Sequence, residues 1–228
     1  MLVSDKRNMS KKNISQEKII QAFIKSAFEK SAGATSLADV SEILEIKKAS
    51  LYNHFESRDA MYGATLEYCA KQVADVSFLP AKTLEAIKSN KINPSTQFKK
   101  LITRYFDLYE NEPFFEIYTL VHTEQYFQLE ALKIVEKETE DIIDSIFKIL
   151  REFSLTGKIS GKSDKELKEA SSIMSAIIIQ QRDFYIVKKK ETVRQNPESG
   201  AGSLFALPTD ETFLNKTVKL VDNFIKAL

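Results

Sequence analysis

The stretch from Ser36 to Phe55 constrains the fold more than any other part of this 228-residue chain. It holds two short apolar patterns at helical spacing, which are Leu37, Val40, Ile43 and Leu44, and then Leu51, Tyr52 and Phe55. Ser36 and Asp39 have the spacing of a capping box, in which each side chain satisfies a free backbone N–H of the first helical turn. Helices this short are unstable alone, so the pair must pack on a third helix. The pattern predicts a helix-turn-helix.

The second of these helices is predicted to leave a polar face free. That face carries Lys47, Lys48, Ser50, Asn53 and His54. All are hydrogen-bond donors or acceptors that can reach base edges in the major groove of DNA. We therefore interpret the segment as a recognition helix, and a merely solvated helix face is the alternative interpretation.

The same residues resemble the N-terminal DNA-binding domain of the tetracycline-repressor (TetR) family. The resemblance rests on Thr35–Val40 and Leu51–Arg58, above all on the Tyr-x-x-Phe sequence that ends the predicted recognition helix, and it covers residues 14–68. Three positions differ from the usual pattern, because Glu45 replaces a turn glycine, Lys47 replaces a capping serine and Ser41 replaces a packing alanine. A left-handed non-glycine residue costs about 1 kcal/mol, and lysine cannot cap a helix.

The resemblance implies a set of DNA contacts. It matches recognition-helix positions to Lys48, Ser50, Tyr52 and His54, and flanking phosphate contacts to Thr35, Ser36 and Arg58. For Tyr52 we expect the hydroxyl to reach a phosphate while the ring packs inward.

Composition limits the class of protein. Apolar residues make up 43% of the chain and charged residues 29%, and only 6 Gly and 5 Pro occur, so long helices are favoured over a turn-rich β fold. The net charge of +1 means that DNA contact must come from a local patch. No apolar run reaches the length of a membrane span, and the first residues lack the apolar core of a signal peptide. We expect a cytoplasmic protein without membrane contact or cofactor.

A first helix is predicted from Ser15, and its apolar face forms the floor for the helix-turn-helix. We therefore expect a DNA-binding domain over residues 1–60 and an effector-binding and dimerisation domain over residues 61–228. The basic residues of the arm over 1–13 allow two interpretations, a solvated tail or an arm that reaches the minor groove. Cys69 is either a core thiol or a redox sensor, and activation of the thiolate needs a basic neighbour.

Successive helical patterns after residue 61 predict an all-α bundle. A long pattern runs from Leu129 to Phe153, Ser163 and Glu166 form a second capping box, and a last helix starts near Thr209. The segment from Ile173 to Ile179 is apolar nearly all round and must be covered on every side. We expect a homodimer joined by a four-helix bundle, with an interface made of Ile173, Ile177, Ile178, Leu214, Val221 and Ile225.

The middle of the chain is rich in aromatic residues. In the TetR family a small effector binds inside the helical bundle, so the resemblance implies an aromatic-lined pocket, which we place at Phe106, Phe115, Tyr118, His122 and Phe147. Tyr118 and His122 lie one helical turn apart and are candidate polar contacts. No glycine-rich loop or arginine cluster accompanies them, so a hydrophobic or aromatic effector is favoured over a phosphate. Core packing is the alternative for most of these rings.

We predict a dimeric, ligand-responsive transcriptional regulator, most simply a repressor of a palindromic double-stranded DNA operator. An enzyme is the rival class, but the acidic run of Glu136, Glu138, Glu140, Asp141 and Asp144 lacks the Glu-x-x-His of a di-iron bundle. We interpret that run as a solvated helix face. A helical protein-interaction module or helical-bundle enzyme without DNA binding is the alternative.

Overall fold

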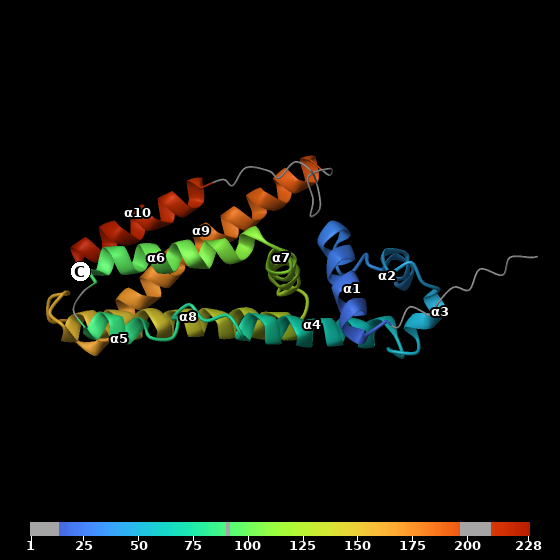
Figure 1. Cartoon of the computed structure of the whole chain (residues 1–228), viewed down its shortest axis with the longest axis horizontal. Coiled ribbons are helices and arrows are strands. Elements are labelled where there is room, and N and C mark those ends of the chain that lie inside the picture. Colours follow the sequence, from blue (N-terminus) through green and yellow to red (C-terminus); the bar gives the residue numbers. More distant parts are fainter. Residues whose placement is uncertain (1–13, 90–91, 197–210) are drawn as a thin grey trace, which may run out of the picture. The chain divides into compact units, whose positions relative to one another are not determined.

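The computed structural model describes residues 14–89, 92–196 and 211–228, and every regular element in these ranges is a helix, as predicted (Figure 1). The chain divides into two compact units, residues 1–68 and 69–228. The division falls within helix α4 (Arg58–Ala74). The arm over residues 1–13 and Thr209 lie outside the described residues.

The N-terminal unit begins with the predicted floor helix, α1 (Gln16–Lys30), which starts where the Ser15 hydroxyl accepts a hydrogen bond from the backbone N–H of Lys18. Ile19, Phe23 and Ile24 are buried on its inner face. Helix α2 (Leu37–Ile43) packs on α1 and starts with the predicted capping box. The structure therefore has the two consecutive helices of the predicted helix-turn-helix, α2 and then α3 (Lys48–Leu51).

The turn after α2 explains why α3 (Lys48–Leu51) is short. Glu45 has a φ of 56°, the left-handed conformation predicted to cost about 1 kcal/mol without glycine. Lys47 precedes α3 without a side-chain hydrogen bond, so the helix lacks the cap that most helices have. Residues 52–54 then form turns, with i→i+3 hydrogen bonds from Asn53 N to Ser50 O and from His54 N to Leu51 O. The recognition segment is one helical turn followed by tighter turns, shorter than the predicted helix.

The C-terminal unit is a helical bundle. Its elements are α5 (Thr83–Lys88), α6 (Pro94–Asp107), the 3-10 helix η1 (Leu108–Glu110), α7 (Phe114–Glu124), α8 (Leu129–Leu155), α9 (Asp164–Gln195) and α10 (Thr212–Ala227). Helix α9 packs against both α8 and α10, and α10 lies beside α6 (Figure 1). The capping box of Ser163 and Glu166 is present at the start of α9. Helix α4 ends at Ala74, and residues 75–79 are not helical.

The two apolar stripes of α10 have different environments. Val221 and Ile225 are buried within the unit, as is Ile178 on α9, so the prediction of these three as dimer contacts is wrong. Residues buried inside one subunit present no surface to a partner. The other stripe of α10 consists of Phe213, Leu220 and Phe224, and Leu220 is exposed. Both stripes are equally apolar in sequence, so periodicity alone did not distinguish the inner from the outer face.

Of the described helices, none combines the length and the apolar character that crossing a membrane requires.

Candidate functional site

The recognition segment over residues 47–54 exposes most of its polar side chains. Lys47, Lys48 and Asn53 are exposed, and Ser50 and His54 are half-buried. Tyr52 is 52% exposed, so the prediction that its ring packs inward is wrong. The inward positions belong to Leu51 and Phe55, which are both buried. A hydrogen bond from Gln16 Nε2 to the carbonyl of His54 (3.1 Å) further ties the end of the segment to α1.

The residues that lead into α2 use their hydroxyls inside the unit. Thr35 is buried, and its hydroxyl donates to the carbonyl of Ser31 (2.9 Å) and lies 3.2 Å from the hydroxyl of Ser26. The predicted phosphate contact by the Thr35 side chain is therefore wrong. Ser36 is exposed, and its hydroxyl donates to Asp39 Oδ2 at 2.7 Å. The hydrogen bond from Lys30 lowers the pKa of Asp39 to about 2, so the capping carboxylate is charged at neutral pH.

Arg58 acts as a clamp within the N-terminal unit. Its Nε donates to the carbonyl of Thr35 at 3.2 Å, and its Nη2 donates to the carbonyl of Ala32. The guanidinium also lies over the rings of Phe23 and Tyr62, with 5.5 and 5.3 Å to the ring centroids. These contacts join the loop before α2 to α1 and α4. The N–H groups of Arg58 that make these contacts are the donors that its predicted phosphate contact would need.

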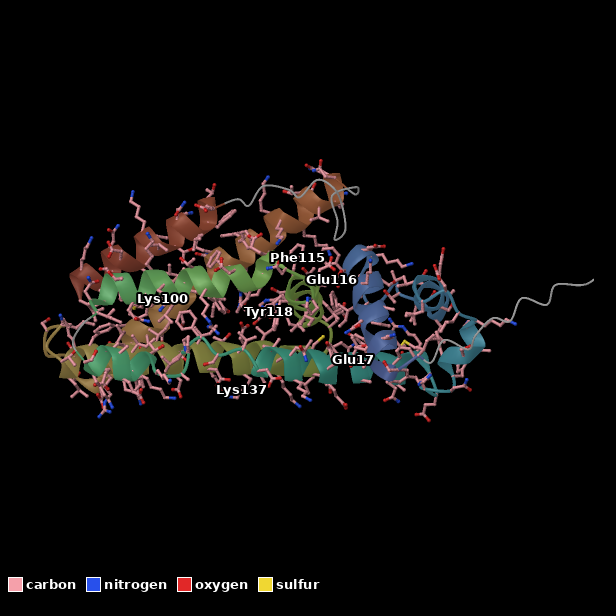
Figure 2. All side chains as sticks on the ribbon, in the orientation of Figure 1. Glu17, Lys100, Phe115, Glu116, Tyr118 and Lys137 are labelled. Atoms are coloured by element: carbon pink, nitrogen blue, oxygen red, sulfur yellow. The ribbon has the colours of Figure 1, made fainter. Side chains whose placement is uncertain are left out.

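The five predicted pocket residues contact different neighbouring side chains. Tyr118 and His122 stack with ring centroids 5.6 Å apart, as their spacing predicted. The ring of Phe106 packs against Tyr185, whereas Phe115 lies under the ammonium of Lys189 and half-buried Phe147 lies under that of Lys168. Figure 2 labels Phe115 and Tyr118 on α7.

Tyr118 and His122 belong instead to a buried polar group that we call the Arg182 cluster, which consists of Tyr105, Tyr109, Tyr118, His122, Glu138 and Arg182. The Arg182 side chain is 0% exposed, and its Nη1 donates to Glu138 Oε1 at 2.7 Å. The hydroxyls of Tyr105 and Tyr118 donate to the same oxygen at 2.6 Å. Three tyrosine rings surround the guanidinium at 5.2–5.7 Å. The cluster thus joins α6, η1, α7, α8 and α9.

The charges in the cluster follow from this geometry. Burial alone would raise the pKa of Glu138, but the guanidinium of Arg182 and the nearby His122 lower it to about 2. Burial raises the pKa values of the hydroxyls of Tyr105, Tyr109 and Tyr118, which remain neutral hydrogen-bond donors. At neutral pH the centre of the cluster is therefore a charged carboxylate–guanidinium pair held by tyrosine hydroxyls.

The assignment of Glu138 to a solvated acidic face is wrong, because this side chain is buried. Its neighbour Lys137 points away from the bundle and pairs with Asp141 (Figure 2). A signal was present in the sequence, since Glu138 stands at i+4 between Ile134 and Ile142. Charges at apolar spacing identify buried ionic residues.

The thiol of Cys69 is buried, and desolvation raises its pKa to about 12. A protonated thiol is a poor nucleophile, so this environment favours the core interpretation over a redox sensor. Within the described ranges, no three His, Cys, Asp or Glu side chains are grouped so as to hold a metal ion.

No family model matches the sequence, and no curated protein is significantly similar to it. Solved structures are similar in fold. A TetR transcription regulator from Haloarcula marismortui has a TM-score of 0.58 and 10% identity over 93% of this chain and 97% of its own. A TetR transcriptional regulator from Legionella pneumophila has a TM-score of 0.53 and 18% identity, covering 93% and 99%.

A transcriptional regulator from Rhodococcus has a TM-score of 0.57 and 12% identity, covering 94% of this chain and 97% of its own. The similarity in each case extends over both units rather than the helix-turn-helix alone. The chain therefore has the fold of TetR-type transcriptional regulators, as the motif in its N-terminal unit predicted.

Proposed function

We propose that this chain is a dimeric transcriptional regulator that binds operator DNA through the recognition segment and responds to a small molecule in its C-terminal unit. The observation that carries the proposal is the exposure of Lys47, Lys48, Tyr52 and Asn53 on one segment whose buried anchors are Leu51 and Phe55. Side chains displayed in this way by a helix-turn-helix are suited to DNA grooves and phosphates. The fold similarity supports a regulator over an enzyme.

Repression relieved by a ligand needs only two arrangements of the protein. If the effector prefers the arrangement in which the two DNA-binding units of a dimer do not match the operator, its binding lowers operator affinity. We retain Tyr118 and His122 as effector contacts, because they lie in the cluster that joins most helices of the C-terminal unit.

Replacing Lys48 by alanine is expected to weaken binding to DNA taken from upstream of the protein's own coding region. One lost phosphate contact lowers the slope of log affinity against log salt by about 0.9, so the loss of affinity should shrink as salt rises. The matched control is Lys165→Ala, which removes the same charge from an exposed position at the start of α9. Gel-shift titrations at several salt concentrations measure both quantities. Equal behaviour of the two variants would contradict the assignment of the recognition segment.

The proposed dimer face is the exposed side of α9 and α10. Ile173, Phe184 and Val187 are exposed along one side of α9, with half-buried Ile177 between them, and Leu220 is exposed on α10. A helix face with this many exposed apolar side chains is typical of a subunit interface. This face includes three of the predicted interface residues, Ile173, Ile177 and half-buried Leu214. It does not include the buried residues Ile178, Val221 and Ile225.

The change Phe184→Glu should therefore convert the dimer to a monomer at micromolar concentration, because a buried unpaired charge is strongly unfavourable. Phe184 is 52% exposed within one subunit, so the variant should still fold, which circular dichroism checks. Phe127→Glu, at a more exposed phenylalanine between α7 and α8, is the matched control and should leave the dimer intact. Sedimentation equilibrium measures the result. A monomeric parent protein, or equal dissociation of both variants, would exclude this face.

A further inference from the structure

The Arg182 cluster is accessible from one side. The side chain of His122 is 17% exposed, and next to it Asp183, whose side chain is 43% exposed, accepts a hydrogen bond from Arg182 Nε at 3.0 Å. The imidazole lies between two carboxylates, with Nε2 3.8 Å from Glu138 Oε2 and Nδ1 3.9 Å from Asp183 Oδ1. Both distances exceed those of hydrogen bonds, which are about 2.7–3.2 Å. We call the partly exposed polar surface at these three side chains the opening, and its internal contacts are loose.

The two oxygens of Glu138 differ in their hydrogen bonding. Oε1 accepts hydrogen bonds from Arg182, Tyr105 and Tyr118. Among the described residues, the charged neighbour of Oε2 is His122, whose Nε2 lies 3.8 Å away. A carboxylate oxygen has two lone-pair sites, so Oε2 has acceptor capacity that the protein leaves to an added donor. Asp183 adds a second, partly exposed acceptor.

Acidic side chains outnumber the guanidinium at the opening. Glu138 and Asp183 contribute −1 each and Arg182 contributes +1. The Nη2 of Arg182 lies 3.4 Å from the Nε2 of His122. A ligand carboxylate or phosphate would be repelled by both acidic groups, whereas a ligand cation would be attracted to them.

Aromatic side chains stack on His122 or follow it closely in the sequence. The ring of Tyr118 stacks on His122 inside the unit. Tyr126 and Phe127 follow His122 by about one helical turn and are 80% and 75% exposed. Apolar side chains this exposed beside a polar group suit a ligand that has an apolar body next to its charged end.

We propose that this opening binds the ammonium group of an amphiphilic amine and that such an amine is the effector, an inference that rests on the regulatory function proposed above. Two of the three N–H donors of a primary ammonium match Glu138 Oε2 and the carboxylate of Asp183. The apolar part of the ligand lies against the aromatic side chains. The proposed ligand differs from the hydrophobic or aromatic effector predicted from the sequence, since a purely hydrophobic molecule would leave the acceptors unpaired.

The position of the site links binding to conformation. Glu138 is hydrogen-bonded to residues of α6, α7 and α9 through its other oxygen. A ligand ammonium that binds Oε2 weakens the attraction between the same carboxylate and Arg182. It therefore favours an arrangement of α6, α7, α8 and α9 in which the contacts of Glu138 differ. Differential affinity for two such arrangements is all that regulation by a ligand requires.

Three compounds with the same ten-carbon chain test the proposal: decylamine, 1-decanol and decanoate, each below its aggregation concentration at pH 7.5 with the full-length protein. Thermal unfolding and operator gel shifts are the readouts. Decylamine should raise the melting temperature and weaken operator binding, because it binds the folded protein and prefers one arrangement. Decanol and decanoate should do so only at concentrations about tenfold higher or more, since one charge-assisted hydrogen bond is worth that factor. An equal or stronger response to decanoate or decanol would overturn the assignment.

The variant Asp183→Asn keeps the size of the side chain and should raise the half-effective decylamine concentration about tenfold. Asp144→Asn, at an exposed position on α8, is the matched control and should respond like the parent. An unchanged response of Asp183→Asn overturns the site. Operator binding without any response to decylamine overturns the amine proposal and leaves the regulator intact. Stabilisation by decylamine in a protein that binds no operator DNA supports the site and overturns the proposed regulatory function.

Discussion

Replacing Arg182 by methionine is expected to lower the free energy of unfolding of the C-terminal unit by about 3–5 kcal/mol, which is typical when one partner of a buried ion pair is removed. Methionine fills most of the volume of the arginine stem, so the loss reports charge rather than a cavity. What remains is Glu138, a buried carboxylate that has lost its neutralising partner. Chemical denaturation of the parent and the variant, followed by circular dichroism, measures the difference. A change below about 1 kcal/mol would contradict a dry, paired cluster.

The double variant with Glu138→Leu and Arg182→Met is the matched control. It removes both charges, and apolar replacement of a buried ion pair is often neutral or stabilising. The double variant should therefore recover most of the stability lost in Arg182→Met. If the double variant is as unstable as the single one, the tyrosine hydroxyls rather than the uncompensated charge determine the loss, since Tyr105 and Tyr118 then lack their acceptor.

The contribution of Glu138 to stability should change with pH in opposite directions in the parent protein and in Arg182→Met. In the parent, the pKa of Glu138 falls from its ordinary value of 4.5 to about 2 on folding. This group therefore stabilises the fold above pH 4.5 and loses that contribution as pH falls towards 2. In Arg182→Met, burial without the guanidinium raises the pKa of the same carboxyl, so acidification should reduce the penalty instead. The difference between the two denaturation curves isolates this carboxyl from the other acidic groups.

The parts of the fold that were predictable from sequence are those in which local chemistry decides the structure. The capping boxes at Ser36 and Ser163 both formed, because a cap depends only on residues three positions apart. The left-handed backbone conformation of Glu45 was also predictable locally, because a tight turn between two short helices requires it. These local signals were enough to identify the helix-turn-helix and the helices of the bundle.

The candidate site was harder to predict because its members are distant in sequence. Glu138 and Arg182 are 44 residues apart, and each alone resembles a solvent-facing charge. Their apolar spacing was visible, with Glu138 between Ile134 and Ile142 and Arg182 four residues after Ile178. The pairing depends on how α8 packs against α9, which periodicity does not specify. The prediction of Val221 and Ile225 as dimer contacts failed for the same reason.

Replacing Arg58 by alanine is expected to destabilise the N-terminal unit by about 2–3 kcal/mol, the sum of lost charge-assisted hydrogen bonds and lost cation–π contacts. The carbonyls of Ala32 and Thr35 lose their donors, and the rings of Phe23 and Tyr62 lose the guanidinium above them. The loop before α2 should open first, because Arg58 joins it to α1 and α4. The change should also lower the apparent operator affinity, because a smaller fraction of the protein is then folded and able to bind DNA.

The dependence of DNA binding on salt and temperature separates this clamp from the phosphate contact that the family resemblance implied. A lost phosphate contact lowers the salt slope by about 0.9 at every temperature, and Lys48→Ala provides that reference behaviour. A lost clamp leaves the slope unchanged and reduces the fraction of protein that is folded, so affinity should return towards the parent value on cooling and fall steeply near the melting temperature. Arg58→Lys should not restore stability, since an ammonium lacks the planar fork that reaches both carbonyls and covers both rings. If Arg58→Ala instead melts like the parent and shows the reduced slope of Lys48→Ala, Arg58 contacts phosphate and its internal contacts contribute little to the fold.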